Sequence, residues 1–229
     1  MDLIEVSENT NRHPWELSRK DCIFKEIKKI KNINNVLDIG CGDGYFDKEL
    51  LKAQPRIKEL YGVDIFLEES YSDGKGNWTN SLENLPNKKF DLILMMDVLE
   101  HIENDNDYMK NIQNRLSDDG VILLTVPAFM KLYSLHDEEL KHFRRYNMKM
   151  LKEALKSTDL KIHNKSYFYL SLIILRLITM NKTQNLSMWN DSEKSFKTKF
   201  VRGVLNIDYA VLRAFSKLHI YIGGLSLLA

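Results

Sequence analysis

The chain has 229 residues, of which 44% are hydrophobic, so it is long enough for one domain with a sizeable core. Its formal net charge is +1, which gives no overall field that would attract nucleic acid or an anionic membrane. Only two cysteines occur, Cys22 and Cys41, which argues against a disulfide framework and makes a reducing cytoplasm the simplest compartment. The first residues, MDLIE, lack the basic and apolar regions of a signal peptide.

The first two thirds of the chain alternate between strand and helix patterns. Apolar residues at helical spacing predict a helix over 15–31. The strands that follow are expected at 36–39, 59–64, 78–79, 90–96 and 121–126, with helices at 44–53 and 104–116. Residues 72–77 have loop composition, and Asp119-Gly120 a turn composition. This alternation predicts a parallel sheet with helices on both faces, in which ligands bind beyond the carboxyl ends of the strands.

The last third follows a different pattern. Helices are expected over 148–156 and 200–217 and strands over 160–168 and 220–228, whereas 181–199 is polar and expected to be mobile. The apolar run 167–180 is shorter than the roughly 20 residues that cross a bilayer, and Arg176 interrupts it. We therefore expect a buried helix there, and a surface that touches lipid or a greasy substrate is the alternative.

A glycine-rich loop with the sequence DIGCGDG, residues 38–44, follows the first predicted strand. Its glycines let the backbone turn tightly and approach a ligand, and the next helix begins with free N–H donors. A dinucleotide fingerprint would need a third glycine where Tyr45 stands. Asp38, before the first glycine, would repel a pyrophosphate. The loop resembles motif I of the class I S-adenosylmethionine-dependent methyltransferases, and a carboxylate such as Asp38 suits their cofactor, which carries an ammonium and a sulfonium.

Two later segments carry the resemblance further. Asp64, at the end of the second strand, matches the family's ribose-binding position. Ser81 stands where the family often has an aspartate that contacts the adenine amino group, so a hydroxyl or the backbone N–H of Leu82 would read the ring instead. The stretch FDLILMMDVLEHI, residues 90–102, is similar to the F-D-x-I-x-x-x-x-V-L-E-H stretch of the small-molecule members, among them quinone-pathway and sugar methyltransferases.

The resemblance therefore implies that the chain binds S-adenosylmethionine. The residues expected at this cofactor are Asp38, Gly40, Cys41, Gly42, Gly44, Asp64, Ile65, Ser81, Leu82, Met96, Asp97 and Arg19.

The resemblance also implies the fold class, which is α/β. We expect a Rossmann-like, doubly wound, mostly parallel sheet of seven strands, with the last strand antiparallel and with a helical C-terminal insertion. In this organisation 1–33 is a helical cap, and 34–168 is the cofactor-binding core with a lid at 127–147. Residues 169–229 are the apolar insertion and final strand of the same domain.

The segment after the fifth strand, 126–146, is too long for a simple connection. It resembles a bacterial subgroup with the pattern V-P-A … H-D-x-x-x-x-H-x-R-R-Y, which tends to carry an N-terminal segment like HPWELSR at 13–19. We expect His136, His142 and Arg145 near the acceptor, with either histidine as a base.

Structural roles remain open for several of these residues. For His101, local bonding at a helix end weighs equally with a role at the acceptor. The alternative for the lid is that Arg144 and Arg145 pair with Asp137, Glu138 or Glu139 and only make it rigid. No metal site is expected, because the spacing of His136, Asp137 and His142 matches no familiar ligand set.

The implied function is methyl transfer to O, N or C of a small molecule. Residues 97–102 contain no N-P-P-Y or D-P-P-Y, which argues against nucleic-acid bases as acceptors. Eight Lys or Arg against two acids in 141–165, followed by the apolar run, suggest an amphiphilic or anionic acceptor and peripheral contact with a membrane. The alternatives are a protein or peptide methyltransferase and a non-catalytic S-adenosylmethionine-binding scaffold. The pattern leaves the oligomeric state open.

Overall fold

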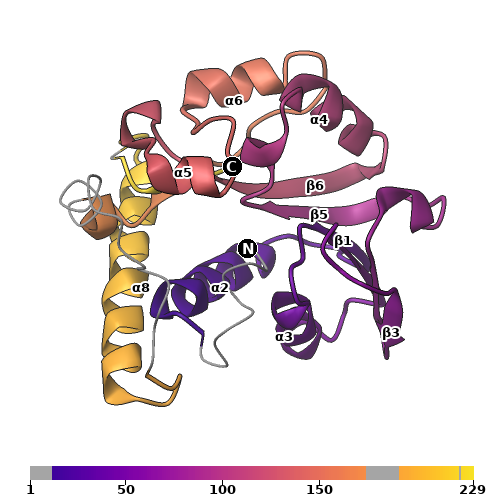
Figure 1. Ribbon diagram of the computed structural model, residues 1–229, viewed down its shortest axis with the longest axis horizontal. Coiled ribbons are helices and arrows are strands. Elements are labelled where there is room, and N and C mark those ends of the chain that lie inside the picture. Colours follow the sequence, from indigo (N-terminus) through magenta and orange to yellow (C-terminus); the bar gives the residue numbers. More distant parts are fainter. Residues whose placement is uncertain (1–11, 174–190, 222) are drawn as a thin grey trace.

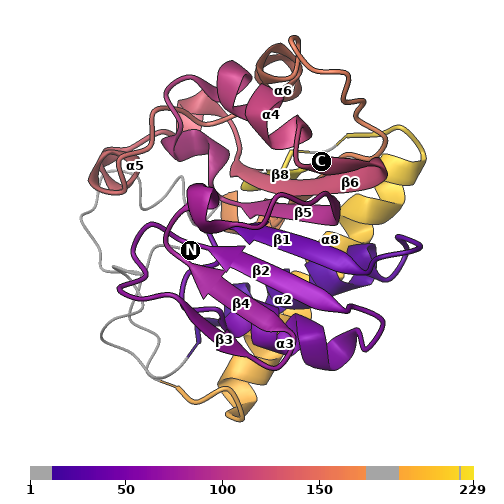
Figure 2. The ribbon, with the colours of Figure 1, turned by 90° about the vertical axis from the view of Figure 1, so that its right-hand side faces the viewer.

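The computed structural model describes residues 12–173, 191–221 and 223–229. In these ranges one sheet holds eight strands in the order β3-β4-β2-β1-β5-β6-β8-β7 (Figure 2). The strands are β1 (Asn35–Ile39), β2 (Glu59–Val63), β3 (Tyr71–Asp73), β4 (Gly76–Thr79), β5 (Phe90–Met96), β6 (Leu116–Pro127), β7 (Ser166–Phe168) and β8 (Ser226–Leu228). The pairs among β4, β2, β1, β5 and β6 are parallel, and β8 is antiparallel to both its neighbours. The predicted mostly parallel α/β sheet with an antiparallel last strand is thus confirmed, with β3 as an added edge strand.

Helices cover both faces of the sheet (Figure 1). The α-helices are α2 (Pro14–Ile27), α3 (Tyr45–Ala53), α4 (Asp105–Gln113), α5 (Leu135–Glu139), α6 (Met148–Ala154) and α8 (Phe196–Lys217), and the 3-10 helices are η1 (Leu82–Asn84), η2 (Leu99–His101) and η3 (Met130–Leu132). Along β5, Ile93 and Met95 join the core under α4 and α6, whereas Leu92 and Leu94 join the core under α2, α3 and α8. Burial on both faces explains why β5 is apolar almost throughout.

Several predicted boundaries are wrong. Residues 72–77 form part of the β3–β4 hairpin, in which Gly74 takes a left-handed φ of 59° that a tight turn requires. The predicted mobile segment ends earlier than expected, because the Ser195 hydroxyl accepts from the N–H of Thr198 and starts α8 at Phe196; 181–190 lies outside the described residues. The predicted turn at Asp119-Gly120 lies inside β6.

The strands of the last third are also shorter than predicted. Only Ser166–Phe168 of 160–168 and Ser226–Leu228 of 220–228 are strand, since each strand pairs along just three residues of the other. The apolar run 167–180 begins as the end of β7 and becomes helical at Leu170, and 174–180 lies outside the described residues.

Ion pairs and hydrogen bonds join α2 to α8. Asp21 accepts two hydrogen bonds from the Arg202 guanidinium, at 2.7 and 2.6 Å, and one from Asn206 at 3.0 Å. Glu26 accepts from the Tyr209 hydroxyl at 2.7 Å and from Arg213 at 3.1 Å. Burial acts to raise the pKa of Glu26, but these donors outweigh it and lower the pKa to about 2. The C-terminal helix therefore fixes the position of α2.

Among the described residues, no helix is both long enough and apolar enough to cross a membrane.

The two sides of α8 should differ sharply in their contribution to stability. Leu205 is 3% exposed and packs in the core under α2, whereas Ile207 is 67% exposed. We expect Leu205→Ala to lower the free energy of unfolding by about 2–5 kcal/mol and Ile207→Ala to change it by less than about 0.5 kcal/mol. Urea unfolding of both variants measures the difference, and equal costs would contradict the packing of α8 described above.

Candidate active site

The parallel register places five strand ends at one edge of the sheet. Ile39 of β1 lies beside Val63 of β2 and beside Met95 of β5. The residues that follow these strands are therefore neighbours, although Val63 and Met95 lie 24 and 56 positions after Ile39 in the sequence. This edge holds most of the predicted site.

The glycine loop connects β1 to α3 with a left-handed backbone. Gly40, Gly42 and Gly44 have φ angles of 75°, 59° and 71°, a region that side chains rarely allow. The N–H of Gly40 donates to the carbonyl of Val63 at 2.7 Å, which anchors the loop to β2. A Cβ on Gly40 would lie 2.5 Å from Cγ2 of Val98, so the loop also packs against the segment after β5. Cys41 lies inside the loop, buried and with a free thiol.

Two carboxyl groups are fully buried beneath this loop. Asp38 is the penultimate residue of β1 and Asp47 lies on α3, and both are 0% exposed. Among the described residues, neither oxygen of Asp38 accepts a hydrogen bond. One oxygen of Asp47 accepts from Trp78 at 2.8 Å, and the other has no partner there. Burial and the facing Asp47 raise the pKa of Asp38 well above its usual range, and burial raises that of Asp47. An ammonium above Asp38 would satisfy these oxygens, so the residues fit the amino-acid part of S-adenosylmethionine.

The predicted ribose and adenine contacts lie at the ends of β2 and β4. Asp64 accepts from the N–H groups of Gly42 at 2.8 Å and Phe66 at 3.0 Å, which orients its carboxylate against the glycine loop. Ile65 beside it is 78% exposed and offers an apolar surface. The Ser81 hydroxyl accepts from the N–H of Glu83 at 3.1 Å and caps η1, directly before Leu82. The structure thus gives Ser81 a local capping role and leaves its contact with adenine a prediction.

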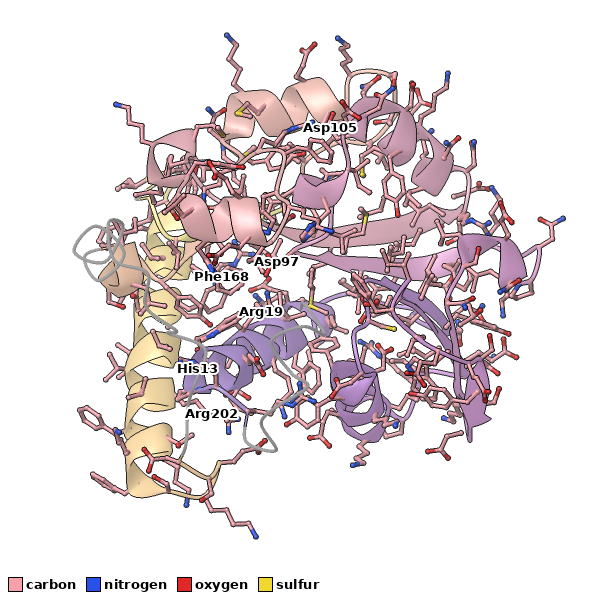
Figure 3. The ribbon with its side chains drawn as sticks, viewed as in Figure 1. His13, Arg19, Asp97, Asp105, Phe168 and Arg202 are labelled. Atoms are coloured by element: carbon pink, nitrogen blue, oxygen red, sulfur yellow. The ribbon has the colours of Figure 1, made fainter. Side chains whose placement is uncertain are left out.

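An ion pair between distant segments closes the other side of the site. Arg19 of α2 donates to the carboxylate of Asp97, which directly follows Met96 at the end of β5 (Figure 3). The Thr125 hydroxyl donates to the same carboxylate at 2.9 Å, and Arg19 stacks 4.7 Å from the Trp15 ring centre. Burial acts to raise the pKa of Asp97, but Arg19 outweighs it and the pKa is lowered. Asp97 has a left-handed φ of 57°, a strained geometry that often marks functional sites.

The segment 127–147, the predicted lid, lies around one buried carboxylate. Asp137 is 0% exposed and accepts from Arg145 Nε at 2.7 Å and from the N–H of Ser134 at 2.9 Å. Its Oδ1 lies 3.0 Å from Nδ1 of His142. Burial acts to raise the pKa of Asp137. His142 and Arg145 donate to the carboxylate and outweigh burial, so that the pKa lies well below its usual range. The Arg145–Asp137 pairing that the sequence left open is present, whereas Arg144 pairs with Asp105 at 2.8 Å.

Three polar side chains meet below the lid. The rings of His101 and His142 form an edge-to-face pair with centres 4.7 Å apart. Ligand atoms of Glu100, His101 and His142 all lie within 4.8 Å of one another, so the cluster has the composition of an acid–base site and of a small cation site. Glu100 is 0% exposed with neither oxygen hydrogen-bonded among the described residues, and burial raises its pKa well above the usual range.

The structure brings together most of the candidate acceptor residues, with one exception. His101, His142 and Arg145 lie around Asp137 and Glu100, whereas His136 lies on the outer side of α5, with its Nδ1 4.0 Å from Glu139. Sequence reasoning did not select Glu100 or give Asp137 more than a rigidifying role. The adjacency of Glu100 to His101 and the five-residue step from Asp137 to His142 were the signals that could have shown them.

Comparisons with known proteins agree with this geometry. The methyltransferase domain family matches residues 15–165. The chain belongs to this methyltransferase family. A ubiquinone biosynthesis O-methyltransferase of Rickettsia bellii is 29% identical over 123 residues, which are 48% of this chain and 51% of that protein. N-methyltransferase 4 of Papaver somniferum is 27% identical over 155 residues, which are 58% of this chain and 40% of that protein. The chain thus spans about half the length of the curated relatives that it matches.

Solved methyltransferase structures share the fold. A SAM-dependent methyltransferase from Archaeoglobus fulgidus superposes with a TM-score of 0.52 at 22% identity, over 91% of this chain and 90% of that chain. The N-methyltransferase NodS from Bradyrhizobium japonicum, solved with S-adenosyl-L-homocysteine, gives a TM-score of 0.53 at 18% identity, over 72% and 87% of the two chains. Family membership and the fit of the buried carboxylates identify S-adenosylmethionine as the cofactor.

Substitution of Gly40 should weaken cofactor binding through the shape of the loop. Gly40→Ala forces a Cβ into a left-handed backbone and against Val98, so we expect calorimetry to show a loss of S-adenosylmethionine affinity of more than about tenfold. Gly74→Ala is the matched control, because Gly74 has a similar φ of 59° but no atom within 4 Å of the added Cβ. Equal affinity in both variants would contradict the placement of the cofactor on this loop.

The buried pair Asp38 and Asp47 should make stability depend on pH. Because the pKa of each is raised in the folded state, the folded protein binds more protons than the unfolded one above about pH 4, and stability falls as the pH rises. Asp47→Asn removes one carboxyl, so its stability relative to the parent should increase from pH 5 to pH 8 by up to about 1.4 kcal/mol per unit. Denaturant unfolding without cofactor measures this difference, and a pH-independent difference would show that the pair ionises normally.

Proposed function

We propose that this chain transfers the methyl group of S-adenosylmethionine to a hydroxyl or amine of a small amphiphilic molecule, with His142 as the base. The observation that carries the proposal is the hydrogen bond between His142 Nδ1 and the buried Asp137, at 3.0 Å. An acceptor that carries a proton has to lose it as the methyl bond forms, and a histidine oriented by a carboxylate is suited to accept that proton.

The residues proposed to hold the cofactor surround the aligned strand ends. Asp38 would face its ammonium, Asp64 its ribose, and Ile65, Ser81 and Leu82 its adenine. When bound, S-adenosylmethionine supplies an electrophilic methyl group on a sulfonium with a neutral leaving group. The protein then has mainly to align the acceptor and exclude water. Met96, Asp97 and Arg19 of the proposed cofactor set stand between that site and the lid.

The hydrogen bond to Asp137 assigns the two nitrogens of His142 different roles. Nδ1 donates to the carboxylate, so Nε2 becomes the nitrogen that accepts a proton. The charged Asp137 stabilises the imidazolium that forms. Arg145 donates to the same Oδ1 of Asp137, and we therefore assign it a positioning role rather than contact with the acceptor.

The surface of the lid supports an acceptor with an apolar part. Met130, Leu135 and Phe143 are exposed on it by 45%, 59% and 51%. The adjacent arginines are engaged, Arg144 with Asp105 and Arg145 with Asp137, which favours an apolar acceptor over an anionic one. Relatives named for O- and N-methylation support a heteroatom as the methylated atom.

Removal of the base should lower turnover without weakening cofactor binding. We expect His142→Ala to reduce kcat by about 10²–10⁴-fold, the usual contribution of a general base, with S-adenosylmethionine affinity changed less than about twofold. Asp137→Asn should lower kcat for the same reason, because it removes the charge that orients the ring. Methyl transfer to a panel of hydroxylated and amino amphiphiles, followed with a labelled methyl group, measures turnover.

Further measurements separate catalysis from structure. His136→Ala is the matched control, since that side chain is 47% exposed and lies away from the cluster, and it should keep full activity. Added imidazole should partly restore His142→Ala if the ring acts as a base. Activity that is lost on chelation and restored by a divalent cation would instead assign Glu100, His101 and His142 to a metal.

The same panel tests the two alternatives. Transfer to peptides but not to small amphiphiles would establish a protein or peptide methyltransferase. Cofactor binding without transfer to any acceptor class would favour a non-catalytic scaffold.

A further inference from the structure

One side of α8 is an exposed apolar strip that no described segment covers. We define the α8 outer face as Phe196, Phe200, Val204, Ile207, Val211 and Leu218, residues that recur every three or four positions or at a multiple of that spacing. Phe196, Phe200, Ile207 and Leu218 are 85%, 62%, 67% and 69% exposed. Because α8 has 22 residues, the strip extends for about 33 Å.

The strip is separate from the side of α8 that holds the fold together. Leu205, Tyr209 and Leu212 are at most 3% exposed and face α2 and the sheet. In Figure 1, α8 stands at the margin of the molecule, with α2 against one side of it. Soluble proteins usually expose apolar residues singly, so an exposed apolar row along one side of a helix whose other side is buried is unusual. The α8 outer face therefore has the character of a contact surface.

The charges at the two ends of the α8 outer face that pair with no described acid are lysines, whereas Lys197, beside Phe196, pairs with Asp191 at 3.1 Å. Lys199 lies at its N-terminal end and Lys217 at its C-terminal end, and both are exposed. The single acid between 195 and 221 is Asp208, whose carboxylate accepts hydrogen bonds from the N–H and the hydroxyl of Ser171. Arg202 and Arg213 turn inward to Asp21 and Glu26.

The strip continues past the helix with the same character. Ile220 and Tyr221 are 49% and 41% exposed, and Lys165 lies 3.9 Å from the centre of the Tyr221 ring. Aromatic and basic side chains together are typical of surfaces that sit at the boundary between water and lipid.

We propose that the α8 outer face binds a membrane surface rich in anionic phospholipid. Charge decides between this occupant and a second copy of the chain. Helix-to-helix contact between two copies would place Lys199 against Lys199 in a parallel pair and near Lys217 in an antiparallel pair, so like charges would meet in either orientation. Anionic headgroups would instead pair with both lysines while the apolar strip enters the boundary of the acyl chains.

Vesicle flotation of the full chain tests the proposal. We expect binding to vesicles of equal parts phosphatidylcholine and phosphatidylglycerol, and much weaker binding to phosphatidylcholine alone. The double variant Phe200→Ser/Ile207→Ser should bind the anionic vesicles more than about tenfold more weakly. Lys199→Glu/Lys217→Glu should weaken binding by about fivefold or more per lysine, and added salt should weaken the parent.

Matched variants and a second measurement make the result decisive. Val121→Ser and Lys58→Glu alter an exposed apolar residue and an exposed lysine away from α8 and should bind as the parent does. Circular dichroism melting of each variant shows that it folds. The proposal is overturned by no binding of the parent, by equal binding of both vesicle types, or by equal binding of all variants. A dimer in sedimentation velocity that Phe200→Ser/Ile207→Ser dissociates would also overturn it, because a second copy would then occupy the face.

Discussion

The site depends on the parallel register of β1 with its two neighbours. Because Ile39 lies between Val63 and Met95, the residues after each strand emerge at one edge. Gly40 then bonds to β2, and the Gly42 N–H to Asp64, so the loop that faces the cofactor is built from two strands at once. A shift of one residue between β1 and β2 would turn Asp38 from the core to the opposite face and separate these partners.

The buried carboxylates of the site fall into two electrostatic classes. Asp38, Asp47 and Glu100 are buried and form no ion pair with another described residue, and the pKa of each is raised. Asp137 is also buried and Asp97 is half-buried, but each has an arginine as partner, and the pKa of each is lowered. The first class carries unsatisfied hydrogen-bonding capacity, which suits ligand binding. The second class joins separate segments of the chain, which suits the positioning of α2 and of the lid.

The sequence predicted the parts of the site that depend on local pattern. The glycine loop, Asp64 and the β5 end follow from strand periodicity and short motifs, and the alternation of strands and helices predicted the sheet. The pattern missed the Ser195 cap that starts α8 at Phe196. It could not predict that Arg202 holds Asp21, because that contact joins residues 181 positions apart. It also could not separate His136 from His142, since the first lies on the short helix α5 and the second only three residues after its end. Only the fold shows which of the two turns toward Asp137.

Asp137 ties the folding of the lid to the chemistry proposed for it. Its carboxylate accepts from Arg145 and from the backbone of Ser134, and these bonds join the start of α5 to the segment that follows it. The same Oδ1 atom that accepts from Arg145 also orients His142. The imidazole can therefore take its position only when the lid is folded. Because the arginine and the histidine share one acceptor, the orientation of the proposed base depends on the same carboxylate that holds Arg145 in the segment.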